Sequence, residues 1–310
     1  MLRIKFSGGR QFCASKSPTS CSCGTLCVTL KKLSMKLLKF TLKILFFCLL
    51  TILTQVGGLV YLISISTHKL TDKWSSKNYL KAIYRFTSFL ILYFFTIILL
   101  VPLIAKPLGR VPLPLNETNH LQPLNIWTCF LNRNYVREEL KQTAFEVAKQ
   151  MNDKFPGTKV NYLDANFPFI NKFPLIPHLS HNDGKKLDIS FCYLDTKTNE
   201  STNDCPSFIG YGICEEPRPN EKNTSYFCTE KGFWQYSFLS KVISQDSRKN
   251  FTFDSNKTKE LVSLFAKQSA IGKIFIEPHL KTRLNLHYDK IRFHGCQAVR
   301  HDDHIHIQLK

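Results

Sequence analysis

Acidic residues are scarce in this sequence of 310 residues. It contains 23 Asp and Glu residues against 42 Lys and Arg residues, which gives a formal net charge of +19. Such an excess favours contact with anions, such as nucleic acids, lipid headgroups or anionic polymers. The sequence contains no recognisable nucleic-acid-binding motif, so we expect no nucleic acid among its partners. An apolar fraction of 44 % excludes a disordered or fibrous chain.

Two long segments near the N-terminus have almost no charged residues. Residues 41–65 carry only Lys43, and residues 87–105 carry none. A helix needs about 20 predominantly apolar residues to cross about 30 Å of hydrocarbon. Residues 41–105 therefore predict two transmembrane helices that are joined by a short basic loop. A cleaved signal peptide is a weaker explanation for the first segment, because its apolar run is too long.

Basic residues beside the two segments predict their orientation. The connecting loop contains five of them: Lys69, Lys73, Lys77, Lys81 and Arg85. Residues 1–40 are interpreted as a basic tail, and Met35 is an alternative start that would shorten it. With Met35 as the start, the loop is the more basic of the two flanks of the first apolar segment and would lie inside. Both termini would then face outward. We therefore expect a multi-pass protein of the cell membrane, whose C-terminal domain faces the periplasm or the cell exterior.

The composition changes after Ala105. Residues 106–130 are rich in Pro and polar residues, which is typical of a linker. Residues 131–310 are long enough for one domain. The chain after residue 105 contains six of the eleven cysteines, and an even number favours disulfides in an oxidising compartment. Buried free thiols are the alternative, and the sequence leaves the pairing open.

Hydrophobic periodicity predicts an α+β fold for this domain. We expect helices at residues 135–153, 233–243 and 257–267, and strands at residues 186–194, 273–276 and 301–309. This mixture indicates a small antiparallel sheet with flanking helices. In the strand at 186–194, alternation places Leu187 and Ile189 on one face and Asp188 on the other.

Histidines cluster in two short segments of the domain, HLSHNDGKKLD and HDDHIH. They are His178 and His181 in the first segment, and His301, His304 and His306 in the second. His304 and His306 share one face of a strand, and His181 reaches Asp188 across a turn at Gly184. Two imidazoles and one carboxylate are a common ligand set for catalytic zinc. Either motif alone occurs often without a metal, so the prediction rests on both motifs together.

The two motifs resemble those of the penicillin-insensitive murein endopeptidases. That family belongs to the zinc peptidases that include lysostaphin-type enzymes, D-Ala-D-Ala dipeptidases and the hedgehog signalling domain. HLSHNDGKKLDI is similar to the first family motif and HDDHIHIQL to the closing one. The segments WQYSFLSKVI and IGKIFIEPHLK follow the family order between them. The resemblance covers roughly residues 135–310 and is weakest at residues 196–231.

The resemblance implies that His181, Asp188 and His306 bind Zn²⁺. It also implies a membrane-anchored zinc metallopeptidase that hydrolyses peptide cross-links of peptidoglycan. In this family, a metal-activated water attacks the amide carbonyl. Peptidoglycan peptides are therefore the expected partners.

The remaining histidines receive catalytic roles from the same resemblance. It implies that His304 is the general base or a transition-state partner, and that His178 and His301 line the site. One departure is Lys186, which stands where the family often has an acidic residue. A non-catalytic zinc-containing binding module on the same scaffold is the alternative, because hedgehog-type domains use this scaffold for binding.

Overall fold

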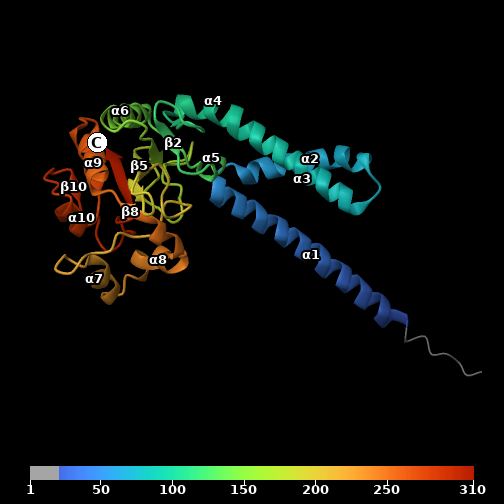
Figure 1. Cartoon of the computed structure of the whole chain (residues 1–310). Helices are drawn as coiled ribbons and strands as arrows, with labels where there is room; N and C mark the ends of the chain where they lie inside the picture. Colours follow the sequence, from blue (N-terminus) through green and yellow to red (C-terminus); the bar gives the residue numbers. More distant parts are fainter. Residues whose placement is uncertain (1–20) are drawn as a thin grey trace, which may run out of the picture. The chain divides into compact units, whose positions relative to one another are not determined.

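The computed structural model describes residues 21–310, with side chains described from residue 31 onward (Figure 1). The chain divides into two units, Met1–Phe46 and Phe47–Lys310. Half of the predicted basic tail, residues 1–20, lies outside the described residues. Helix α1 (Cys21–Thr54) contains Met35, the alternative start.

Two helices are long and apolar enough to cross a membrane. The first is Lys31–Thr54, with a mean hydropathy of 2.0, and the second is Asn78–Leu108, with a mean hydropathy of 2.6. They contain 24 and 31 residues. At 1.5 Å per residue, these helices reach about 36 Å and about 46 Å, which exceeds the thickness of the hydrocarbon layer of a bilayer.

The expected span at residues 41–65 is wrong as a single helix. Helix α1 ends before Gln55, whose φ of 66° is left-handed, and α2 (Gly57–Thr71) begins after it. A Cβ atom at Gly58 would lie 2.7 Å from the carbonyl oxygen of Phe47, so this close approach requires glycine. Hydropathy could not reveal the break, because the chain is apolar on both sides of it.

Helix α2 pairs with the second apolar helix. That helix consists of α3 (Asn78–Phe95), a π-helical segment (Thr96–Leu100), α4 (Val101–Ala105) and a 3₁₀ turn (Lys106–Leu108). Thr67 Oγ1 lies 2.9 Å from Ser88 Oγ, and Arg85 forms an ion pair with Asp72. The predicted basic loop is therefore the tip of a helical hairpin.

The hairpin joins the C-terminal domain at its opposite end. The hydroxyl of Tyr93 donates to the carbonyl oxygen of Phe130 at 2.6 Å. The side-chain oxygen of Gln55 accepts from the backbone N–H of Phe169 at 2.8 Å. The end of α1 and the second half of the α3–α4 helix therefore both contact the domain.

A six-stranded mixed sheet forms the centre of the domain, in the order β10-β9-β11-β5-β4-β2. Its strands are β2 (Leu121–Pro123), β4 (Val160–Tyr162), β5 (Lys186–Ser190), β9 (Ile271–Phe275), β10 (Ile291–Arg292) and β11 (His304–Leu309). The expected antiparallel arrangement holds only for its three central pairs. At each edge, the outermost pair is parallel, and each of these pairs is linked by a helical crossover, as parallel neighbours require.

Two helices share a hydrophobic core with this sheet: α6 (Glu138–Lys154) and α9 (Ser255–Lys267). Leu187 of β5 and Ile305 of β11 belong to that core. Side chains alternate along a strand, so Asp188 and His306 point to the opposite face. The domain therefore uses one face of the sheet for packing and leaves the other for a polar site.

Most predicted elements exist, with changed bounds. The helix predicted at 257–267 is α9, and the terminal strand is β11, which begins at His304. The helix predicted at 135–153 begins later, because Tyr135–Val136 forms strand β3 and pairs with β1 (Val111–Pro112). The helix predicted at 233–243 is a 3₁₀ segment (Trp234–Ser237) followed by α8 (Phe238–Val242).

A predicted strand and the predicted linker also differ from expectation. The strand predicted at 186–194 divides into β5 and β6 (Tyr193–Asp195), because β6 pairs in a separate small sheet with β7 (Ser201–Thr202) and β8 (Phe251–Phe253). The expected linker at 106–130 contains β2 of the central sheet and helix α5 (Trp127–Phe130). The folded part therefore begins before residue 131.

The cysteines of the domain form one disulfide. It joins Cys228 of α7 (Thr224–Glu230) to Cys296, with a Cα–Cα distance of 5.2 Å. The other four cysteines after residue 105 are free: Cys129, Cys192, Cys205 and Cys214. Burial raises the pKa of the Cys192 thiol to about 12. The alternative of buried free thiols therefore holds for Cys129 and Cys214, whereas Cys192 and Cys205 are free but only half-buried.

Candidate metal centre

Strands β5 and β11 bring the two histidine-containing motifs together. In their antiparallel register, His306 lies opposite Asp188 and His304 opposite Ser190. His181 approaches from the turn before β5, where Gly184 has a φ of 80° that favours glycine. Backbone pairing therefore places residues more than a hundred positions apart beside one another.

Three side chains direct their donor atoms to one point. His181 Nε2 lies 3.0 Å from His306 Nδ1 and 3.2 Å from Asp188 Oδ1, and the last two atoms lie 2.8 Å apart. Donor atoms at tetrahedral zinc, with bonds of about 2.0–2.1 Å, are separated by about 3.3 Å. Little adjustment would be needed for this buried group to hold a metal ion.

Hydrogen bonds orient the first of these imidazoles for metal binding. His181 Nδ1 lies 2.6 Å from the carbonyl oxygen of Ala165. A carbonyl can only accept, so Nδ1 carries the proton and the lone pair of Nε2 points at the group. The other carboxylate oxygen of Asp188, Oδ2, accepts a hydrogen bond of 2.8 Å from the Tyr211 hydroxyl.

Two further histidines flank the group. His178 Nδ1 lies 3.0 Å from Asp164, and His304 Nδ1 lies 2.5 Å from Asp303. Each imidazole therefore donates to a carboxylate through Nδ1. In both rings Nε2 is buried and has no hydrogen-bond partner within the described part of the chain. Buried polar atoms are usually satisfied, so these atoms indicate a missing partner such as water or substrate.

His178 and His304 could form a second metal group with Asp188. Their nitrogens lie 3.6 and 3.7 Å from Asp188 Oδ2, farther than in the first group. That oxygen is also occupied by the hydroxyl of Tyr211. The geometry therefore favours His181, Asp188 and His306 as the ligand set.

The electrostatics separate the roles of the histidines. Burial lowers the pKa of His306 to about 3, so this imidazole is neutral, as a metal ligand must be. Burial also lowers the pKa of His304, but Asp188 and Asp303 outweigh it and raise the value to about 9. Burial raises the pKa of Asp188, but the neighbouring imidazoles bring it well below its usual range. In the metal-free protein His304 therefore carries a positive charge.

The group lies at the base of an open cleft of about 670 Å³. Its walls come from three segments, residues 176–181, 234–239 and 294–306. His301 lies in the last segment, 5.0 Å from His304 and 5.6 Å from His306 between ring centroids. Burial and these two rings bring the pKa of His301 well below its usual value. His301 is therefore a neutral group at the cleft.

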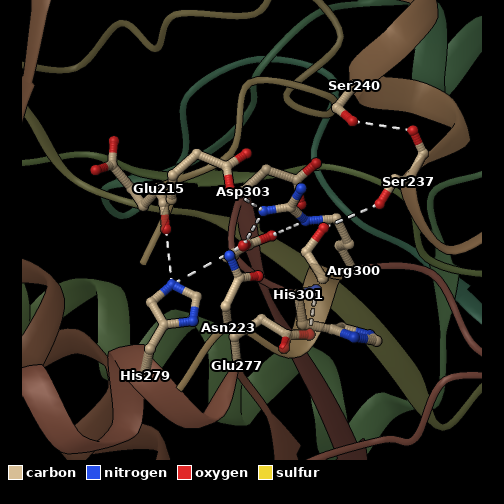
Figure 2. A network of polar contacts seen from close by, with 12 residues as sticks. Glu215, Asn223, Ser237, Ser240, Glu277, His279, Arg300, His301 and Asp303 are labelled. Atoms are coloured by element: carbon tan, nitrogen blue, oxygen red, sulfur yellow. Dashed lines mark hydrogen bonds and ion pairs between the residues drawn. The ribbon is translucent and has the colours of Figure 1, made fainter. Parts of the chain in front are cut away.

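A buried polar network holds the segment that carries His301 and His304 (Figure 2). Arg300 forms a two-fold ion pair with Asp302. Glu277 accepts hydrogen bonds from the hydroxyl of Tyr236 at 2.5 Å and from the backbone N–H of His301 at 3.2 Å. Burial and the charge of Asp302 raise the pKa of Glu277 to about 7. The network fixes the backbone from which His301 and His304 project.

The structure brings all six predicted residues into one cluster. They are His178, His181, Asp188, His301, His304 and His306. Their individual roles stay predictions. Sequence reasoning gave no role to Asp164, Tyr211 and Asp303, which hold residues of the site, or to His294, which lines the cleft. Asp303 is adjacent to His304, Tyr211 lies between two glycines, and His294 is near Cys296, but these are weak signals.

No protein-family model matches this chain, and no curated protein has a significantly similar sequence. The resemblance of the two histidine-containing motifs therefore stands without an independent match.

Proposed function

We propose that the protein is a membrane-anchored zinc metallopeptidase, similar to murein endopeptidases, that hydrolyses peptide cross-links of peptidoglycan. One observation carries this proposal: His181, Asp188 and His306 aim three donor atoms at one point, and two imidazoles with free Nε2 atoms stand beside them. Two imidazoles and one carboxylate suit zinc with an open position. When bound, zinc would activate a water molecule and polarise the scissile carbonyl.

The surrounding residues supply proton transfer and charge stabilisation. Asp303 holds His304 with its Nε2 3.7 Å from Asp188 Oδ2, beside the metal group, and the raised pKa favours a proton on this ring. A protonated imidazole can donate to an oxyanion, which supports the role of a transition-state partner. His178 is held by Asp164 with a lone pair on Nε2, and can accept a proton from the attacking water.

Metal content and turnover of the purified full chain test this proposal. We expect one zinc per chain, and release of cross-link fragments from purified muropeptides. His306→Ala should lose zinc and cleavage, whereas His304→Ala should keep zinc and lose at least ~100-fold in turnover. His287→Ala is the matched control, because this exposed histidine lies outside the cleft.

The alternative is a binding module that uses the metal site without catalysis. It predicts that the zinc-loaded chain binds peptides but cleaves none, and that His304→Ala keeps the affinity. Full zinc occupancy without cleavage of any muropeptide would therefore favour the alternative. Absence of bound zinc in the wild-type chain would reject both.

We propose that the C-terminal domain faces the periplasm or the cell exterior, and that the chain crosses the membrane three times. The two long apolar helices support membrane insertion. The break at Gln55 supports a third crossing by α2, because it turns the chain back at the domain side. Helix α2 and the 3₁₀ turn Asp72–Trp74 together reach about 28 Å, close to the hydrocarbon thickness.

Three crossings change the expected position of the N-terminus. The basic tail and the basic hairpin tip then lie on the same side, opposite to the domain. With three crossings, the basic tail and the basic hairpin tip can both lie in the cytoplasm, as the positive-inside rule favours. With two crossings they lie on opposite sides of the membrane, so only one of them can. We therefore replace the expectation of two outward-facing termini with a cytoplasmic N-terminus and an external C-terminus.

A further inference from the structure

Three side chains of the central sheet lie in one row beside the candidate metal group. Gln308 of β11 is opposite Lys186 of β5 on one side and opposite Lys273 of β9 on the other. Directly opposed residues of antiparallel strands project from the same face of a sheet. Lys186 precedes the candidate ligand Asp188 by two residues, so the row shares the face of the metal group at a spacing of about 6.6 Å. We call these three residues the lysine row.

One lysine of the row has no anionic partner. The ammonium group of Lys186 donates to Asp183 Oδ2 at 2.6 Å, and the Lys186 side chain is 11 % exposed. Lys273, in contrast, is exposed and forms no ion pair with any described residue. The half-buried side chain of Gln308 makes no hydrogen bond within the described part of the chain. The row therefore combines an uncompensated positive charge with free N–H donors.

His294 connects the row to the cleft. It lines the cleft, and its ring stacks on Phe275 with centroids 4.1 Å apart. Phe275 follows Lys273 by two residues on β9, so both side chains project from the same face. Burial lowers the pKa of His294, and the charges of Lys273 and Lys186 lower it further. The row is therefore close enough to act on charged groups in the adjoining part of the cleft.

We propose that the lysine row binds a free carboxylate of the peptide within two residues of the scissile amide. Two extended residues span about 7 Å, which matches the spacing between the row and the metal group. A carboxylate only accepts hydrogen bonds, and its bonds to charged donors are the stronger kind. Lys273 and the side-chain amide of Gln308 would donate to it, and Lys186 would add its charge from beneath.

This inference rests on the proposed function and narrows it. Cross-link peptides with a free carboxyl group near the scissile amide would be preferred over peptides in which that group is amidated. The inference also gives a role to Lys186, the position at which the chain departs from the motif of the murein endopeptidases.

Binding of one cross-linked muropeptide in two forms tests the inference. The carboxyl group nearest the cross-link amide is free in one form and amidated in the other, and both forms carry the same fluorescent label. Fluorescence polarisation is read directly after mixing with the full chain in lipid nanodiscs, before cleavage alters the probe. We expect at least roughly fivefold tighter binding of the free form, with a smaller difference at high salt, because salt screens exposed charges. Empty nanodiscs provide the baseline.

Charge reversal identifies the site of binding. Lys273→Glu should remove the preference for the free form, while binding of the amidated form and the zinc content stay unchanged. Lys267→Glu is the matched control, because this exposed lysine belongs to α9, which packs on the opposite face of the sheet. Equal binding of both forms, no binding of either, or a full preference in Lys273→Glu would overturn the inference. A preference for the free form without cleavage of any muropeptide would count against the proposed function alone.

Discussion

Tyr211 holds the free oxygen of the central carboxylate. Its hydroxyl donates to Asp188 Oδ2 at 2.8 Å and accepts from the backbone N–H of Asp164 at 3.1 Å. Asp188 is completely buried, so this bond fixes which oxygen turns toward His181 and His306. Loss of a partner that orients a metal ligand in this way typically costs about 10–100-fold in metal affinity.

Removal of this hydroxyl should therefore weaken metal binding. We expect Tyr211→Phe to lower the affinity for zinc about 10–100-fold, because the carboxylate loses its orienting donor. Competition with a chelator of known affinity measures the change. Tyr226→Phe removes an exposed hydroxyl outside the cleft and should leave the affinity unchanged. Unchanged zinc affinity in Tyr211→Phe would show that Tyr211 only packs against the site.

At the scale of elements, the site divides between a rigid base and a less regular wall. Strands β5 and β11 carry Asp188 and His306 within a continuous ladder. The wall comes from residues 176–181, from the loop after β10 and from the short helices after α7. The disulfide Cys228–Cys296 joins the loop to α7, directly before those short helices. The metal group and the cleft should therefore respond differently to reduction.

Loss of the disulfide should loosen the cleft and leave the metal. We expect the double variant Cys228→Ser, Cys296→Ser to cleave muropeptides several-fold more slowly, with unchanged zinc content. Its free energy of unfolding should fall by about 2–4 kcal/mol, which thermal unfolding will detect. Cys48→Ser, which changes a free thiol in α1, is the control. A parallel loss of zinc would contradict this division of the site.

At the scale of the whole molecule, the number of membrane crossings decides on which side of the membrane the N-terminus lies. Three crossings place the N-terminus and the tip of the α2–α3 hairpin on one side, and the domain on the other. Two crossings place both termini on the side of the domain. The two arrangements differ only in the position of the N-terminus.

Protease protection of epitope tags distinguishes these arrangements. Tags are placed at the N-terminus, between Ser75 and Ser76, and at the C-terminus of the full chain. In right-side-out vesicles we expect protease to remove only the C-terminal tag, and in inverted vesicles the other two. Removal of both terminal tags from right-side-out vesicles would support two crossings. Removal of all three tags in both preparations would reject membrane insertion.

Local patterns in the sequence predicted much of the fold. The spacing of Leu140, Ala144 and Val147 identified helix α6, and the alternation of Leu187, Asp188 and Ile189 identified which residues of β5 face the core. The break at Gln55 and the parallel edges of the sheet were missed. They depend on contacts between segments, which hydropathy and periodicity do not record.

The sequence by itself determined the longer helices of the domain, the apolar segments and the six residues of the candidate site, because residue spacing expresses helix and strand geometry directly. Only the tertiary structure decided that Asp164 and Tyr211 belong to this site, which cysteines pair, and that no Lys, Arg, Asp or Glu among the described residues lines the cleft. The physical reason is distance along the chain. These features arise where segments that are distant in the sequence come into contact. Packing and hydrogen bonding in the folded domain decide which segments do so.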